Sequence, residues 1–200
     1  MPAADDSRHK CTRVPVLRIS SKIVCSAIVS LITGTPDKPS REASGPLCAV
    51  PPLRSQRDRD AIRQALVDGT VDAICSDHTP VDDDEKLLPF GEASPGATGL
   101  ELLLSLSLKW AAEMMPSKEQ LAAAVARISV DPARVAGLDA GKLSVGSTAD
   151  VCIFDPDTRW IVNANSLTSQ GKHTPFIGYE LQGRVSHTIV SGRLAFSRAA

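Results

Sequence analysis

The sequence has few aromatic residues, almost no net charge and no long apolar run. Aromatic side chains make up 4% of its 200 residues, and the formal net charge is −1 at pH 7. Both values argue against nucleic-acid binding, which relies on basic patches and stacking rings. No stretch approaches the roughly 18 apolar residues of a transmembrane helix. The apolar run at residues 23–32 has no small-residue cleavage site after it, so we interpret it as a buried element and not a signal peptide.

The cysteines follow no recognisable pattern either. There are five, an odd number, and no two of them form a Cys-x-x-Cys pair. Such cysteines are typical of a reducing compartment, where the thiols behave as small apolar side chains. The apolar fraction of 42% and charged fraction of 22% are those of an ordinary globular protein. Together these features predict a soluble cytoplasmic protein.

Residues 1–46 contain no motif that we can assign. The first 13 residues are polar and are predicted to be disordered, whereas 14–32 are rich in β-branched residues. The prolines and glycines of 33–46 indicate a linker or a long loop.

Regular signals begin after residue 50. Ser55 and Asp58 match a helix capping box, and Asp68-Gly69 predicts the end of that helix. The apolar run 71–75 then predicts a short buried strand that ends in Asp77 and His78. A helix followed by a continuous apolar strand is typical of a parallel sheet with helical crossovers.

The remaining elements fall into a helical group and a β group. The helices are predicted at 100–115, ended by Pro116; from a Ser117/Gln120 capping box to about 128; and from an Asp131-Pro132 start to about Gly137. The strands are predicted at 149–154, 160–162, 184–190 and 192–196, with turns at Gly146, Asp155-Pro156 and Ser191-Gly192. The chain thus divides into an α/β part up to about residue 137 and a smaller β part after it.

Several of these segments occur together, in order, in one known family. They are PPLR at 51–54, SDHTP at 76–80, PGATGLE at 95–101, DPAR at 131–134, the segment 141–155, TPFIG at 174–178 and TIVSG at 188–192. This set resembles the last third of a dihydroorotase of the amidohydrolase superfamily. The resemblance extends from about residue 46 to 197.

The resemblance implies an α/β fold: the C-terminal part of a (β/α)8 metal-dependent hydrolase barrel plus a small β-sandwich segment. Residues 1–46 stay unassigned, 47–137 become a partial barrel, and 138–200 become the sandwich segment and C-terminal tail. Residues 71–76 would be the eighth barrel strand, and Asp77 would lie at its C-terminal end, where this fold places catalytic residues.

The resemblance also implies an activity and site residues. Family members hydrolyse dihydroorotate to N-carbamoyl-aspartate in pyrimidine biosynthesis, with zinc ions that generate hydroxide. By position, Asp77 would bind the metal and shuttle the catalytic proton, and Arg54, Pro95 and Gly96 would contact the substrate. Without the resemblance, Asp77 and His78 could equally be structural residues of a turn, and Arg54 an ordinary surface residue.

Most of the family's metal ligands have no counterpart in the sequence. The family holds its metals with a His-x-His pair, a carboxylated lysine and two further histidines from earlier strands. The histidines here are His9, His78, His173 and His187, and none forms His-x-His. A complete barrel takes about 250 residues. A free aspartate has a pKa of about 3.9, so taking a proton from bulk water costs it about 16 kcal/mol of free energy. We therefore expect this chain alone not to bind zinc and to be inactive.

Two alternatives stay open. Val50 and Val81 stand where the family often has substrate-contacting Asn and His, so the chain could be a non-catalytic homologue, a structural partner of aspartate transcarbamoylase. A gene-model error in residues 1–46 would also explain a segment without motifs. In either case an incomplete barrel has an unpaired sheet edge, which favours self-association.

Overall fold

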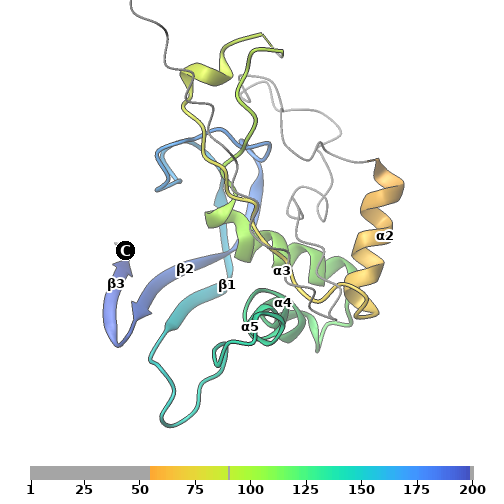
Figure 1. Cartoon of the computed structure of the whole chain (residues 1–200), viewed down its shortest axis with the longest axis vertical. Helices are drawn as coiled ribbons and strands as arrows, with labels where there is room; N and C mark the ends of the chain where they lie inside the picture. Colours follow the sequence, from red (N-terminus) through yellow and green to blue (C-terminus); the bar gives the residue numbers. More distant parts are fainter. Residues whose placement is uncertain (1–54, 90, 199–200) are drawn as a thin grey trace, which may run out of the picture.

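A helical layer packs against one three-stranded sheet in the computed structural model, which describes residues 55–89 and 91–198 (Figure 1). The elements are, in chain order, α2 (Gln56–Val67), the 3-10 turns η1 (Asp84–Lys86) and η2 (Leu100–Leu102), α3 (Leu103–Met114), α4 (Gln120–Ile128), α5 (Val130–Ala136), β1 (Val151–Ile161), β2 (Glu180–Val190) and β3 (Arg193–Ser197). The predictions for residues 1–46, and those for Val50 and Arg54, lie outside the described residues.

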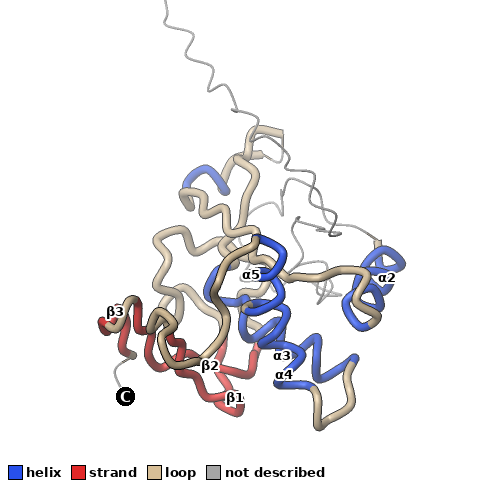
Figure 2. The backbone as a smooth tube through the Cα atoms, turned by 60° about the horizontal axis from the view of Figure 1, so that its bottom comes forward, coloured by secondary structure: helices blue, strands red, loops and turns tan. Residues whose placement is uncertain are grey.

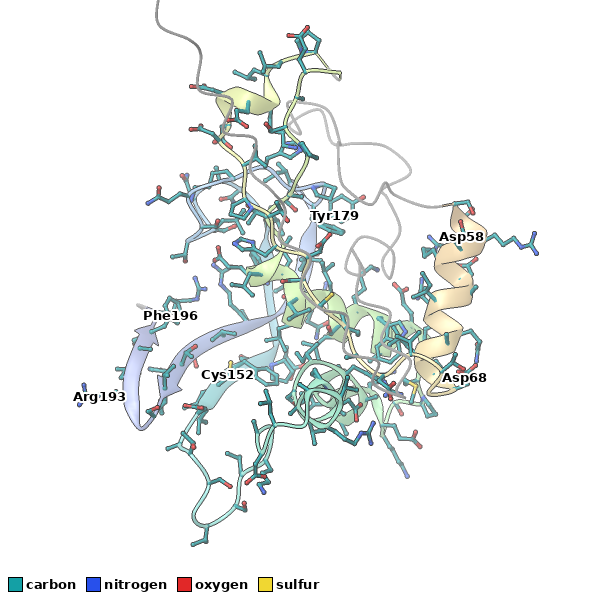
Figure 3. All side chains as sticks on the ribbon, in the orientation of Figure 1. Asp58, Asp68, Cys152, Tyr179, Arg193 and Phe196 are labelled. Carbon is teal, nitrogen blue, oxygen red and sulfur yellow. The ribbon has the colours of Figure 1, made fainter. Side chains whose placement is uncertain are left out.

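Helix α2 begins and ends where its capping residues predict. The Ser55 hydroxyl accepts a hydrogen bond from the Asp58 backbone N–H, and the Asp58 carboxylate accepts one from the Ser55 N–H, each at 3.3 Å. Asp58 and Asp68 mark the two ends of the helix in Figure 3. Gly69 leaves the helix with a φ of 77°, a conformation that glycine adopts without steric penalty. An aspartate therefore completes this capping box in place of the usual glutamate.

The strand predicted at 71–76 is not formed. Val71 and Ile74 are buried as expected, but in the part of the chain that the structure describes no strand pairs with this segment. Instead, the Ile74 N–H donates to the Arg127 carbonyl at 2.9 Å, and the Arg127 guanidinium donates to the Asp72 carbonyl at 3.2 Å. The apolar composition of this segment correctly predicted that it is buried. A β-strand also needs a neighbouring strand to bond with, and here Arg127 of α4 makes hydrogen bonds to the segment instead.

Helix α3 forms close to its predicted limits, with η2 as its first turn and its end before Pro116. The two following helices begin differently from the prediction. Glu119, not Ser117, precedes α4, because the Gln120 amide donates to the Ala112 and Met115 carbonyls at the end of α3 and forms no capping box. Ser129, not Asp131, precedes α5, which ends at Gly137 as predicted.

The sheet is antiparallel with the order β1-β2-β3. Strand β1 is continuous, so the turn predicted at Asp155-Pro156 is instead an irregularity within one strand. The Asp155 carboxylate stabilises it by accepting from the Asp157 N–H at 2.8 Å and the Thr158 hydroxyl at 2.7 Å. Ser191 and Gly192 form the predicted hairpin turn, with φ values of 49° and 77° that fit a two-residue type I′ turn.

One hydrophobic core joins the helices to the sheet. Leu106 and Trp110 of α3 pack in the same cluster as Trp160 of β1 and Leu181 of β2. Gly183 of β2 lets α3 come close, because a Cβ there would lie 2.3 Å from the Leu108 side chain. Figure 2 shows the strands gathered on one side of α3 to α5, with long loops beside them. No helix among the described residues is long and apolar enough to cross a membrane.

Candidate functional site

Asp77 ends the extended segment in an unusual backbone conformation. Its φ is 47°, in the left-handed region that few residues other than glycine adopt, at roughly 1 kcal/mol or more of backbone strain. The side chain is exposed, and the described residues offer its carboxylate no hydrogen bond or ion pair. The Thr79 N–H, two residues on, donates to the Ala97 carbonyl at 3.0 Å. The turn thus presents a solvated carboxylate, and the bond from Thr79 to Ala97 anchors the backbone that follows it.

His78 has a structural role that explains its place after Asp77. Its Nδ1 accepts hydrogen bonds from the Gly99 and Leu100 backbone N–H groups, at 3.2 and 3.3 Å. These N–H groups stand at the start of η2 and α3, where no preceding helical turn supplies acceptors. Because Nδ1 accepts, the proton of the neutral ring is on Nε2. His78 therefore fastens the Asp77 turn to the beginning of the long helix.

Two glycines allow the segment 95–99 to lie directly against the Asp77 turn. Gly96 is buried with a φ of 142°, and a Cβ there would lie 2.5 Å from the Thr79 carbonyl oxygen. A Cβ on Gly99 would lie 2.5 Å from the Ser76 carbonyl oxygen. Pro95, at the start of the segment, is exposed. The segment that carries Pro95 and Gly96 therefore packs against the residues on either side of Asp77, whereas the roles predicted for Asp77, Pro95 and Gly96 stay predictions.

A third segment, 171–174, completes this packing. The Thr98 N–H donates to the His173 carbonyl at 2.8 Å, and its buried hydroxyl donates to the Gly171 carbonyl at 2.6 Å. A Cβ on Gly171 would lie 2.8 Å from the Val81 carbonyl oxygen. Two loops distant in sequence, 95–99 and 171–174, therefore support the Asp77 turn. By contrast, the acidic run 82–85 is exposed.

The described residues do not fit the zinc site that the resemblance implied. Among residues 55–89 and 91–198, no group of three or more His, Cys, Asp or Glu side chains could hold a metal ion. Protein zinc sites have three or four such ligands. Asp77 contributes one carboxylate, and Nδ1 of its neighbour His78 is occupied by backbone N–H groups.

A cavity of about 480 Å³ lies next to His78, on the side of the sheet. Its wall consists of His78, Leu100, Glu101, Leu104, Trp160, Ser166, Thr168, Ser169, Gln170, Arg184, Val185, Phe196 and Arg198. The Arg184 guanidinium lies 4.4 Å from the centre of the Trp160 ring, and that of Arg198 5.5 Å from the centre of the Phe196 ring. Sequence reasoning did not single out these arginines, because nothing in a strand pattern distinguishes them from other surface arginines.

Comparison with known proteins identifies the family. The model described as "Amidohydrolase family" matches residues 18–195, and the chain belongs to this family. It is 43% identical over 148 residues to a protein of Geobacter metallireducens named dihydroorotase. It is 44% identical over 146 residues to a Citrifermentans bemidjiense protein of the same name. These alignments cover 74% and 73% of this chain but only 34% of each relative. The predicted resemblance is confirmed.

Solved structures agree on the family fold. L-hydantoinase (dihydropyrimidinase) from Arthrobacter aurescens superimposes with a TM-score of 0.69 at 27% identity, covering 86% of this chain and 39% of that one. D-hydantoinase (dihydropyrimidinase) from Thermus sp. gives 0.66 at 28% identity, covering 76% and 34%. The described part shows a three-stranded sheet and its helices, so the expected barrel is present only in part.

Proposed function

We propose that this chain supplies the C-terminal part of a dihydroorotase-type cyclic amidohydrolase of pyrimidine biosynthesis. Such an enzyme cleaves a ring C–N bond of dihydroorotate with water to give N-carbamoyl-aspartate. The observation that carries the proposal is the 43% identity to proteins named dihydroorotase. In the proposed enzyme, residues 47–137 form part of the barrel and residues 138–200 form part of the β-sandwich. The enzyme is proposed to be cytoplasmic.

Each predicted site residue has a role in this proposal. Asp77 handles the proton, since its carboxylate is exposed and free of competing contacts among the described residues. Gly96 and Pro95 border the substrate from the adjoining segment, and Arg54 provides a charge opposite to that of the substrate carboxylate. The described residues lack the ligand set for zinc, so the chain alone is proposed to be inactive.

We expect the purified chain to contain no stoichiometric zinc and to show no dihydroorotate turnover above background. Zinc is measured by elemental analysis and turnover by the absorbance of dihydroorotate. The intact dihydroorotase of Geobacter metallireducens serves as the positive control. Stoichiometric zinc together with turnover in the isolated chain would contradict the proposed inactivity.

The family role is tested by a chimera in which residues 46–197 replace the matching third of the Geobacter protein. We expect the chimera to hydrolyse dihydroorotate, and Asp77→Asn in it to lower kcat by about 10²-fold or more, as loss of a proton-transfer group does. A folded, zinc-loaded chimera without turnover, or one unaffected by Asp77→Asn, would refute the proposed role.

A non-catalytic homologue that associates with aspartate transcarbamoylase is the second candidate. Val81 favours it, because this half-buried side chain packs against Gly96 and offers no hydrogen bond to a substrate. If this candidate is right, transcarbamoylase from the same cells will co-elute with the tagged chain in size-exclusion chromatography, and the chimera will be inactive. A lone monomer would count against it.

A further inference from the structure

The cavity beside His78 has the size and the walls of a small-molecule site. Its volume of about 480 Å³ falls within the roughly 300–1,000 Å³ of ligand pockets. Leu100, Leu104, Trp160 and Phe196 give it apolar walls. Such a pocket, with a few charged groups at defined places, is the usual form of a site for a small organic ligand.

The two arginines of the cavity are not paired with an acidic side chain of the described residues. Arg184 and Arg198 form no ion pair with any described residue. Arg198 donates through Nε to the Val185 carbonyl at 3.1 Å, and this bond leaves its two terminal nitrogens unused. Each guanidinium instead lies over an aromatic ring, an arrangement that orients it without neutralising it.

Among the described residues that line the cavity, Glu101 is the only acidic one, and its carboxylate already accepts hydrogen bonds. It accepts hydrogen bonds from the backbone N–H groups of Thr168 and Ser169 at 2.8 to 2.9 Å. Counting one negative and two positive side chains, with His78 neutral, the wall keeps one net positive charge. A monoanion would balance that charge.

The electrostatic environment of Arg184 also favours a bound anion. Burial, followed by the charge of Arg198, lowers the pKa of the Arg184 guanidinium below its ordinary value, whereas Glu101 acts in the opposite direction. A partly buried charge close to a like charge is unfavourable, and a bound anion relieves both effects. Guanidinium groups are also well suited to hold a carboxylate through two parallel hydrogen bonds.

We propose that this cavity binds a small organic monocarboxylate with a flat ring. The carboxylate lies between Arg184 and Arg198, and the ring lies against Trp160 and the neighbouring leucines. The site is distinct from the exposed carboxylate of Asp77, although His78 borders both. The proposal rests on the cavity and its charges and does not depend on the proposed function.

Benzoate binding to the full chain tests the proposal through tryptophan fluorescence. Of the two tryptophans, Trp160 lines the cavity and Trp110 does not. We expect saturable quenching with a dissociation constant of about 1 mM or lower, a range accessible to a ligand of this size. Benzyl alcohol, a neutral molecule of the same shape, is expected to bind about 10-fold more weakly or not at all. Orotate serves as a second ring monocarboxylate.

Matched variants separate the arginine contacts from general effects. Arg184→Gln and Arg198→Gln are each expected to weaken benzoate binding about 10-fold, and Arg184→Lys less. Arg193→Gln removes the same charge from the hairpin end of β3, outside the cavity wall and apart from Phe196 (Figure 3), and is expected to leave affinity unchanged. Circular dichroism verifies that each variant is folded. Equal affinity for benzoate and benzyl alcohol, no saturable quenching, or full affinity in both folded glutamine variants would overturn the proposal.

Discussion

Replacing Gly96 with alanine is expected to lower the free energy of unfolding by roughly 2–4 kcal/mol. Two effects add at this position. The φ of 142° is strained for any residue with a side chain, and the new Cβ would lie 2.5 Å from the Thr79 carbonyl oxygen. That obstacle is backbone, so it cannot rotate away as a flexible side chain would. The change is measured as a shift of the urea midpoint at constant slope.

Gly91→Ala is the matched control for this substitution. A Cβ on Gly91 meets nothing within 4 Å, and the residue lies in the same loop region. We expect an effect within about 0.5 kcal/mol. Hydrogen exchange gives a local readout, because Gly96→Ala should expose the Thr79 N–H that donates to Ala97. Equal losses for the two alanine variants would show that the close approach of the two loops is not the cause.

Replacing Arg127 with alanine is expected to destabilise the chain by a similar amount, about 2–4 kcal/mol. Its guanidinium, 17% exposed, donates to the Leu66 and Asp72 carbonyls at 2.8 and 3.2 Å and to the Asp131 carboxylate at 2.9 Å. Removing it leaves two carbonyls and a poorly exposed carboxylate without this donor. Thermal and urea unfolding of the variant measure the loss.

Arg134→Ala provides the comparison, because Arg134 also pairs with Asp131, at 3.1 Å, but its side chain is 65% exposed. Exposed ion pairs contribute little, so we expect a change of at most about 0.5–1 kcal/mol. If the two alanine variants lose the same stability, the hydrogen bonds from Arg127 to the two carbonyls contribute nothing. Burial alone would then hold the segment 71–76 in place.

Local sequence rules predicted some element ends correctly but placed the starts of α4 and α5 and the turn at Asp155-Pro156 wrongly. The ends of α2 follow from Ser55, Asp58 and Gly69, and the hairpin turn from Ser191-Gly192, because each depends on contacts within a few residues. The segment 71–76 was predicted as a strand and is not one. Its hydrogen-bond partners are determined by distant parts of the chain. A run of apolar residues predicts that a segment is buried, but it does not predict which segment it pairs with.

The candidate site was predicted in the same uneven way. Asp77, Pro95 and Gly96 were named from a family motif, and Gly96 and Gly99, which can be recognised in the sequence, let their two segments pack closely. The cavity with Arg184 and Arg198 was not foreseen. It forms where β2, the end of β3 and the loop 166–170 come together. No local sequence pattern predicts that these three segments lie next to one another.

The irregularity in β1 has a consequence for how copies of this chain meet one another. Strand β1 is an edge of the described sheet, and an exposed edge can template pairing with another molecule. At its middle, Pro156 offers no N–H, and the charged residues Asp155, Asp157 and Arg159 surround it on the same strand. A second β-strand approaching this edge would find an interrupted row of donors and a cluster of charges. The kink that replaces the predicted turn therefore protects the edge against strand-by-strand aggregation.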